Sequence, residues 1–277
     1  MSYVSAGRDL LRSAGSSTSH VKHRTMVILA DPDYQLRVLL EKEVGVEGQL
    51  RRRGAGLEGL QLKSLSGSRK ESEWLRQRAG GAGWTVQSLM GAEATELRLN
   101  EVRAPTLLHL ATHGLFLPEL KKSERDWEGP MQRSLLMLAG AQRSMEALGR
   151  GRIPVAEQDG LVTAAEIAKL NLEGTWLVVL SACETGQGEA LAGEGVLGLR
   201  RGFIRAGAQN LLLTLWPVGD RETLPLMQGF YGHLLASEPI RPSLALSLSQ
   251  RESLKKMRQH HGLSQAVRLA GPFILSR

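Results

Sequence analysis

The chain has 277 residues, of which 42% are hydrophobic and only 4% aromatic, so its length allows one large domain or two small ones with a mainly aliphatic core. A single cysteine excludes an internal disulfide and a zinc site built from several thiolates. The formal charge of +7 predicts a basic surface, but the basic runs lack the interleaved aromatic side chains typical of nucleic-acid binding.

The termini and the longest apolar runs indicate where the protein works. No apolar run reaches the ~18 residues needed to span a membrane, and the amino terminus has no apolar leader. The lone cysteine fits a reducing compartment. We therefore expect a cytoplasmic protein that binds neither membranes nor, directly, nucleic acids.

The first half of the chain divides into a lead and the start of one domain. Residues 1–24 are rich in Ser, Gly and Arg without periodicity, which predicts a flexible lead, and residues 25–277 form the domain. Apolar and alternating patterns predict strands at 25–30, 60–65, 84–89 and 106–112, and helical spacing predicts helices at 36–44, 69–79 and 95–102. Residues 45–59 and 117–130 are expected to be loops.

The second half continues the alternation of strands and helices. Strands are expected at 135–139, 177–182, 210–216 and 272–275, and helices from 163 and at 195–206, 222–236 and 243–259. Thr163 and Glu166 have the spacing of a capping box, and residues 140–160 are expected to be a loop. The alternation predicts an α/β sandwich with a mostly parallel central sheet.

Two of the expected strands end in residues that do chemistry. One apolar run ends in His113 and Gly114, and another ends in Ser181, Ala182 and Cys183. Sites in open α/β sheets form just beyond the carboxyl ends of strands. A thiol and an imidazole at two such ends are the parts of a cysteine nucleophile and its proton partner.

Each of these residues also has an ordinary structural interpretation. A lone cysteine is more often a small buried hydrophobic residue, and a lone histidine is more often structural, as we assign for His109 inside its strand. The coincidence of both strand ends beside glycines favours catalysis. Gly114 would let its backbone N–H approach a substrate carbonyl as part of an oxyanion hole, with the Cys183 N–H as second donor.

A glycine pattern suggests dinucleotide binding, but it fits poorly. Residues 193–198 read G-x-G-x-x-G, and Asp220 follows. The glycines should directly follow a strand, whereas a long loop separates them from Ala182, and Glu194 would face the phosphates. We expect these glycines to allow close helix packing, and we expect no cofactor and no metal.

Several segments together resemble the CHAT domain, a group of caspase-like cysteine peptidases related to separases and often joined to TPR repeats. The resemblance covers residues 25–276. It rests on His-Leu-Ala-Thr-His-Gly at 109–114, Val-Val-Leu-Ser-Ala-Cys-Glu-Thr-Gly at 178–186, Gly-Glu-Gly-Val at 193–196, Ala-Gly-Ala at 206–208, Leu-Trp-Pro-Val-Gly-Asp at 215–220 and Phe-Tyr-Gly-His-Leu at 230–234.

The resemblance implies a caspase-like α/β/α sandwich and a catalytic dyad of His113 and Cys183, with Gly114 and Cys183 forming the oxyanion hole. Asp220 falls where separase-like sequences carry an acid of the S1 pocket, which would favour Arg or Lys at P1. The alternative is that Asp220 caps the helix at 222–236. Glu184 and Glu194 are rival acids near the site, and Glu184 is a second S1 candidate.

The resemblance also implies a regulated proteolytic switch acting on a protein substrate, since relatives are held inactive until a partner acts. The activator would be a separate protein or a TPR-containing module, and some bacterial relatives cleave gasdermin-like proteins in antiviral defence. The loops at 117–130 and 140–160 are candidates for autocleavage. The alternative function is a catalytically silent, caspase-like interaction module. One departure from the family is the absence of Trp at 267–270, before the last strand.

Overall fold

The computed structural model describes most of the domain and little of the lead. The described residues are 2–3, 23–40, 57, 59–117, 129–155, 158–181, 192–216, 218–236 and 241–276, with backbone only at 2–3 and 192–196. Residues 4–22 of the predicted lead and most of the predicted loops at 45–59 and 117–130 therefore lie outside the described residues.

Seven strands form the central sheet, in the order β1-β10-β9-β8-β4-β2-β3. Every neighbouring pair is parallel except β9 and β10. The predicted fold class, an α/β sandwich with a mostly parallel central sheet, is confirmed. The strands are β1 (Ser2–Tyr3), β2 (Thr25–Pro32), β3 (Thr85–Gly91), β4 (Leu107–Ala111), β8 (Leu177–Leu180), β9 (Leu211–Thr214) and β10 (Phe273–Ser276).

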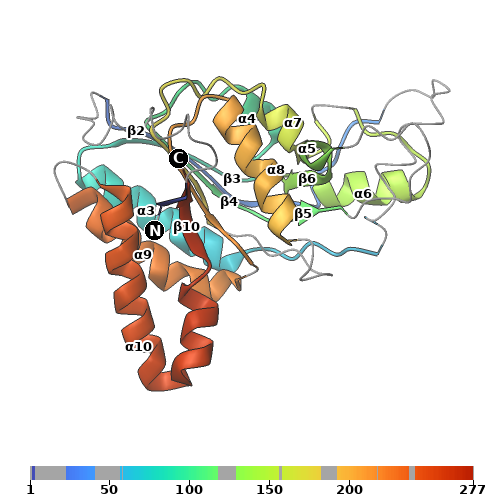
Figure 1. Ribbon diagram of the computed structural model, residues 1–277. Helices are drawn as coiled ribbons and strands as arrows, with labels where there is room; N and C mark the ends of the chain where they lie inside the picture. The colour runs from blue at the N-terminus through green and yellow to red at the C-terminus, as the bar shows by residue number, and fades with distance from the viewer. Residues whose placement is uncertain are drawn as a thin grey trace.

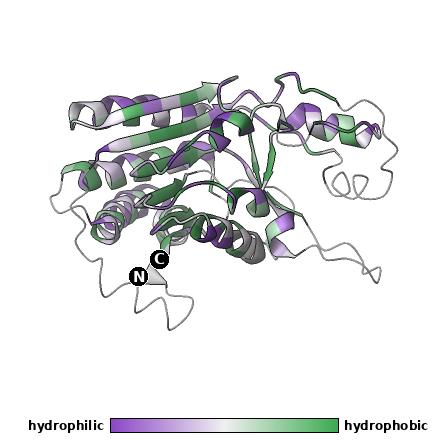
Figure 2. Cartoon of the chain, turned by 90° about the horizontal axis from the view of Figure 1, so that it is seen from above, coloured by the Kyte–Doolittle hydropathy of each residue, from purple (hydrophilic) through white to green (hydrophobic). Residues whose placement is uncertain are grey.

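Helices cover both faces of this sheet (Figure 1). The first face carries α3 (Ser66–Gly81), α9 (Asp220–Ala236) and α10 (Pro242–Ala270), and the second carries α4 (Glu96–Asn100), α7 (Ala164–Ile167) and α8 (Ala192–Arg205). Side chains along β2 alternate between the two cores, with Met26 and Ile28 in one and Val27 and Leu29 in the other. From above, hydrophobic strands lie between the helical layers (Figure 2).

A second, smaller sheet follows directly after β4. It consists of β5 (Gly114–Phe116), β6 (Ser134–Met137) and β7 (Leu161–Thr163), which pair antiparallel in that order. The helices α5 (Pro130–Arg133) and α6 (Ala141–Gly149) accompany it. Leu135, Met137 and Leu161 of this sheet belong to a third core that includes Tyr34, whereas Leu136 and Val162 pack into the core on the second face of the central sheet. His113 therefore stands at the junction of the two sheets.

Three local predictions were wrong. Residues 36–40, the described part of the helix predicted at 36–44, are not helical. Their exposed and half-buried positions alternate, and Leu40 forms an antiparallel bridge with Pro154. Residues 60–65 contain no strand, and the backbone N–H of Leu62 donates instead to the Gln142 side chain. The predicted loop 140–160 contains α6, whose apolar face packs into the third core.

The last helix is longer than predicted and contains a break. The expected helix at 243–259 extends to Ala270, but Gly262 has φ +79° and ψ 170°, a conformation that favours glycine. The chain reverses there, so α10 forms two arms side by side that project from the sheet (Figure 1). The second arm leads directly into β10.

Candidate functional site

His113 leaves the end of β4 with its imidazole largely buried, at 6% exposure. Its Nε2 lies 2.8 Å from the backbone carbonyl oxygen of Lys63. A carbonyl can only accept, so Nε2 carries the ring proton in the neutral imidazole and Nδ1 carries the lone pair. This tautomer is the one a general base needs, and the buried position holds the ring in a single orientation.

Tyr34 supports His113 from the side. The two rings lie 5.2 Å apart at a tilt of 37°, and the Tyr34 hydroxyl lies 3.0 Å from Thr112 Oγ1 and accepts from the His113 N–H at 3.4 Å. Burial raises the pKa of Tyr34, so its hydroxyl stays neutral. Sequence analysis missed both Tyr34 and the Lys63 carbonyl, because nothing in the sequence signals contacts across this distance.

The partner strand of the predicted site is the immediate neighbour of β4. β8 pairs with β4 in parallel, with Leu180 opposite Leu110, and the Ser181 N–H donates to the Leu110 carbonyl at 2.9 Å. The strand that leads to His113 and the strand that leads toward Cys183 are therefore neighbours in the sheet. Cys183 and Glu184 lie outside the described residues, so the contact between Cys183 and His113 stays a prediction.

A buried polar cluster lies behind the two strand ends. Glu71 of α3 accepts from Ser181 Oγ at 2.6 Å and lies 3.1 Å from His109 Nε2, and both Glu71 and His109 are at most 1% exposed. The other ring nitrogen of His109 is 2.9 Å from the Tyr231 hydroxyl. Burial and the Glu71 carboxylate raise the pKa of Tyr231, so this hydroxyl stays neutral.

This cluster supports the structural role assigned to His109. Glu71 lies within the helix predicted at 69–79, but α3 begins earlier, at Ser66, and Glu71 is buried. A signal was available, since Glu71 and Leu75 are one turn apart on the same helix face. A carboxylate one turn from a core leucine lies on the helix face that packs into the core, which indicates a buried acid.

Gly114, the predicted oxyanion donor, is buried and begins β5, where it pairs with Leu136. A Cβ at this position would be 3.6 Å from the Leu135 carbonyl oxygen, an ordinary contact. The fold itself therefore does not require glycine here.

Asp220, the predicted S1 acid, holds the beginning of α3. Its carboxylate accepts from the backbone N–H of Gly67 and of Ser68, the latter at 2.7 Å, and from Ser68 Oγ at 2.8 Å. A Cβ at Gly67 would lie 2.7 Å from the Asp220 carboxyl carbon, so glycine is needed for this approach. Asp220 thus caps α3, rather than the helix that follows it in sequence.

Within the described ranges, no group of three or more His, Cys, Asp or Glu side chains is arranged to hold a metal ion. The same ranges contain no helix with the length and apolar character of a membrane span.

Comparison with protein families gives a match over nearly the whole chain. The family model described as "CHAT domain" matches residues 1–267. The chain belongs to the CHAT domain family. Two curated relatives, both Tetratricopeptide repeat protein 28, are similar to part of it: the mouse protein is 34% identical over 111 residues and the human protein is 33% identical over 114 residues.

The relatives are much longer than the matched segment. The mouse match covers 40% of this chain and the human match 41%, and each covers 4% of the relative. Among solved structures, the Arg-specific cysteine proteinase gingipain R is similar with a TM-score of 0.47 and 7% identity, over 94% of this chain and 48% of that chain.

Proposed function

We propose that this CHAT domain protein is a cysteine endopeptidase with His113 and Cys183 as its catalytic dyad. The observation that carries the proposal is the register of β4 and β8, in which Leu110 lies opposite Leu180. His113 is the third residue after Leu110, and Cys183 is the third after Leu180. The two catalytic residue types therefore follow paired positions of adjacent parallel strands at the same offset.

The tautomer of His113 fits the proton transfers of this reaction. His113 Nδ1 takes the thiol proton, and the thiolate of Cys183 attacks the carbonyl carbon of the peptide bond. The C–N bond then breaks as the imidazolium returns its proton to the leaving amine, which leaves a thioester on Cys183. Water, deprotonated by His113, attacks the thioester and releases the carboxylic acid, and the proton restores the thiol.

The oxyanion of each tetrahedral intermediate would be held by the backbone N–H groups of Gly114 and Cys183. Donors fixed before the reaction stabilise the developing charge without reorganisation. In support, the pairing of Gly114 with Leu136 fixes its backbone position, and a Cβ there would make only ordinary contacts, so packing alone does not explain the glycine.

The proposed substrate is a protein. Its cleavage is regulated, because it occurs only after an activating protein or a TPR-containing module binds the domain. Support for a TPR context comes from the two tetratricopeptide repeat relatives. We extend to this chain, as part of the proposal, a role in bacterial defence with a gasdermin-like substrate in the cytoplasm.

The lone cysteine gives a direct test of the proposed activity. Iodoacetamide can alkylate only one thiol in this chain, Cys183. We expect the protein, with candidate activators added, to cleave a peptide library diversified at P1, and the lost activity to match the alkylated fraction measured by intact mass. Full cleavage by completely alkylated protein would overturn the proposal. An unreactive thiol with no cleavage would favour a silent interaction module.

Replacing Asp220 with alanine tests two roles at once. We expect the free energy of unfolding to fall by about 1 to 2 kcal/mol, because two backbone N–H groups at the start of α3 lose their acceptor. Urea unfolding measures this loss. The control is Arg221→Ala, at the exposed position of α9 that follows Asp220. Profiling of P1 on the same variant tests the S1 role, which an unchanged preference for Arg or Lys would exclude.

A further inference from the structure

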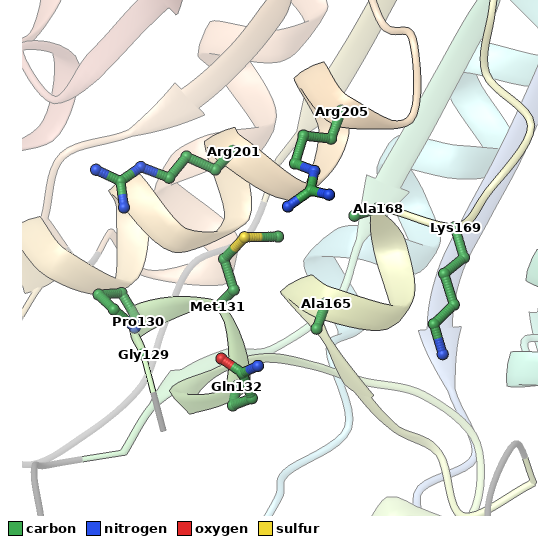
Figure 3. A pocket seen from close by; sticks show the side chains of 9 residues that line it. All are labelled: Gly129, Pro130, Met131, Gln132, Ala165, Ala168, Lys169, Arg201 and Arg205. Carbon is green, nitrogen blue, oxygen red and sulfur yellow. The ribbon is translucent and has the colours of Figure 1, made fainter. Parts of the chain in front are cut away.

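A cavity of about 460 Å³ lies between α5, α7 and α8, on the second face of the sheet (Figure 3). Its volume lies within the range of cavities that bind ligands. The lining consists of Gly129, Pro130, Met131, Gln132, Ala165, Ala168, Lys169, Arg201 and Arg205.

The two sides of this cavity differ in chemistry. Arg201 and Arg205 extend from α8 along one side, and Met131 of α5 and Ala165 of α7 face them from the other (Figure 3). One wall is therefore cationic, and the opposite wall is mainly apolar apart from the Gln132 amide. Lys169 lies at the α7 end of the cavity.

The cations of this cavity have no acidic partner among the described residues. No carboxylate lines the cavity, and no described side chain forms an ion pair with Arg201, Arg205 or Lys169. Arg201 and Arg205 are both exposed and stand one helical turn apart, where like charges destabilise a helix. An anion placed between them would relieve this repulsion.

The walls are held at a fixed separation by two glycines of α8. A Cβ at Gly198 would overlap Ser134 Oγ and the Pro130 carbonyl oxygen, and a Cβ at Gly202 would lie 2.6 Å from the Ala164 carbonyl oxygen. α8 therefore packs directly on the backbone of α5 and α7. Such close contact preorganises the cavity, so a ligand need not order it.

We propose that this cavity binds an extended segment of a partner protein in which acidic and apolar residues alternate. Residues four apart on a helix are separated by about 6 Å along its axis, and alternate residues of an extended chain by about 6.6 Å. Two acidic side chains at positions i and i+2 would therefore each meet one arginine. The intervening side chains point to the opposite side and would pack on Met131, Ala165 and Ala168.

The chemistry of the two walls distinguishes this ligand from other anions. Guanidinium groups form paired hydrogen bonds with carboxylates and with phosphates alike. A small phosphate would satisfy the arginines but leave the apolar wall uncovered. The binding site is independent of the proposed peptidase activity, and binding can be measured without any cleavage.

Fluorescence polarisation with two labelled peptides of equal composition tests the proposal. One peptide is Glu-Leu-Glu-Leu-Glu-Leu, and the other has the same residues in blocks, Glu-Glu-Glu-Leu-Leu-Leu. We expect the alternating peptide to bind at least about tenfold more tightly, and Arg201→Gln or Arg205→Gln each to weaken it about tenfold or more. Arg76→Gln, at an exposed position of α3 on the other face of the sheet, is the matched control.

Equal binding of both peptides would overturn the proposal, and so would equal binding by the arginine variants and the control. The chain itself carries acidic residues at alternate positions just before Gly129, namely Glu124, Asp126 and Glu128. The same titration is therefore run on a protein with E124Q, D126N and E128Q. Binding by this protein at wild-type strength or tighter supports the site, and absence of binding by both proteins excludes it. Inorganic phosphate that displaces the alternating peptide at low millimolar concentration would also exclude it.

Discussion

Replacing Cys183 with alanine is expected to abolish peptide cleavage, and replacing His113 with alanine is expected to lower kcat/KM by a factor of about 10² to 10⁴. The first change removes the proposed nucleophile. The second removes the group proposed to take the thiol proton and return it to the leaving amine. The Lys63 carbonyl holds the His113 ring through Nε2, which leaves Nδ1 as the ring nitrogen proposed to take the thiol proton.

A second readout separates this role of His113 from a structural one. A thiol has an ordinary pKa near 8.5, so only a small fraction is thiolate at pH 7 unless a base is present. We expect His113→Ala to slow the alkylation of Cys183 by iodoacetamide at pH 7, while His260→Ala, at an exposed position of α10, leaves it unchanged. Wild-type kinetics and alkylation in folded His113→Ala protein would remove His113 from the site.

Replacing Glu71 with alanine is expected to lower the free energy of unfolding by about 3 to 5 kcal/mol. Glu71 Oε1 accepts from Ser181 Oγ at 2.6 Å and lies 3.1 Å from His109 Nε2. All three side chains are at most 1% exposed. Alanine would leave the buried Ser181 hydroxyl without its acceptor and would remove the carboxylate that lies beside the buried His109 imidazole.

Two further variants resolve the cause of this loss. Glu73→Ala changes an exposed carboxylate two residues along the same helix, and we expect it to shift stability by less than about 0.5 kcal/mol. Glu71→Gln keeps an acceptor oxygen and should recover part of the loss. Urea unfolding measures all three, and a Glu71→Ala protein as stable as the Glu73→Ala protein would contradict the proposed role of the buried cluster.

The Glu71 cluster also connects the stability of the domain to its site. Ser181 is two residues before Cys183, and His109 is four residues before His113. One carboxylate of α3 thus contacts both strands that lead to the proposed dyad. α3 in turn begins at the carboxylate of Asp220 and follows the segment whose Lys63 carbonyl orients His113.

The sequence by itself determined the layers of this fold. Mainly apolar runs at 106–112, 177–182 and 210–216 predict strands of a parallel sheet covered by helices on both faces, and β4, β8 and β9 lie within them. Capping chemistry is equally local, and the box formed by Thr163 and Glu166 is present as predicted. His113 at a strand end could be found for the same reason.

Only the tertiary structure decided the contacts between distant segments. Residues 36–40 carry helical spacing, but pairing of Leu40 with Pro154 overrides that propensity. α6 lies in a stretch rich in Gly and Arg that reads as a loop, and burial of Met145 and Leu148 in the third core stabilises it. The carbonyl of Lys63, the inward turn of Glu71 and the cap that Asp220 places on α3 depend on long-range packing. Local patterns cannot encode such contacts, because each needs two segments that meet only after the sheet has formed.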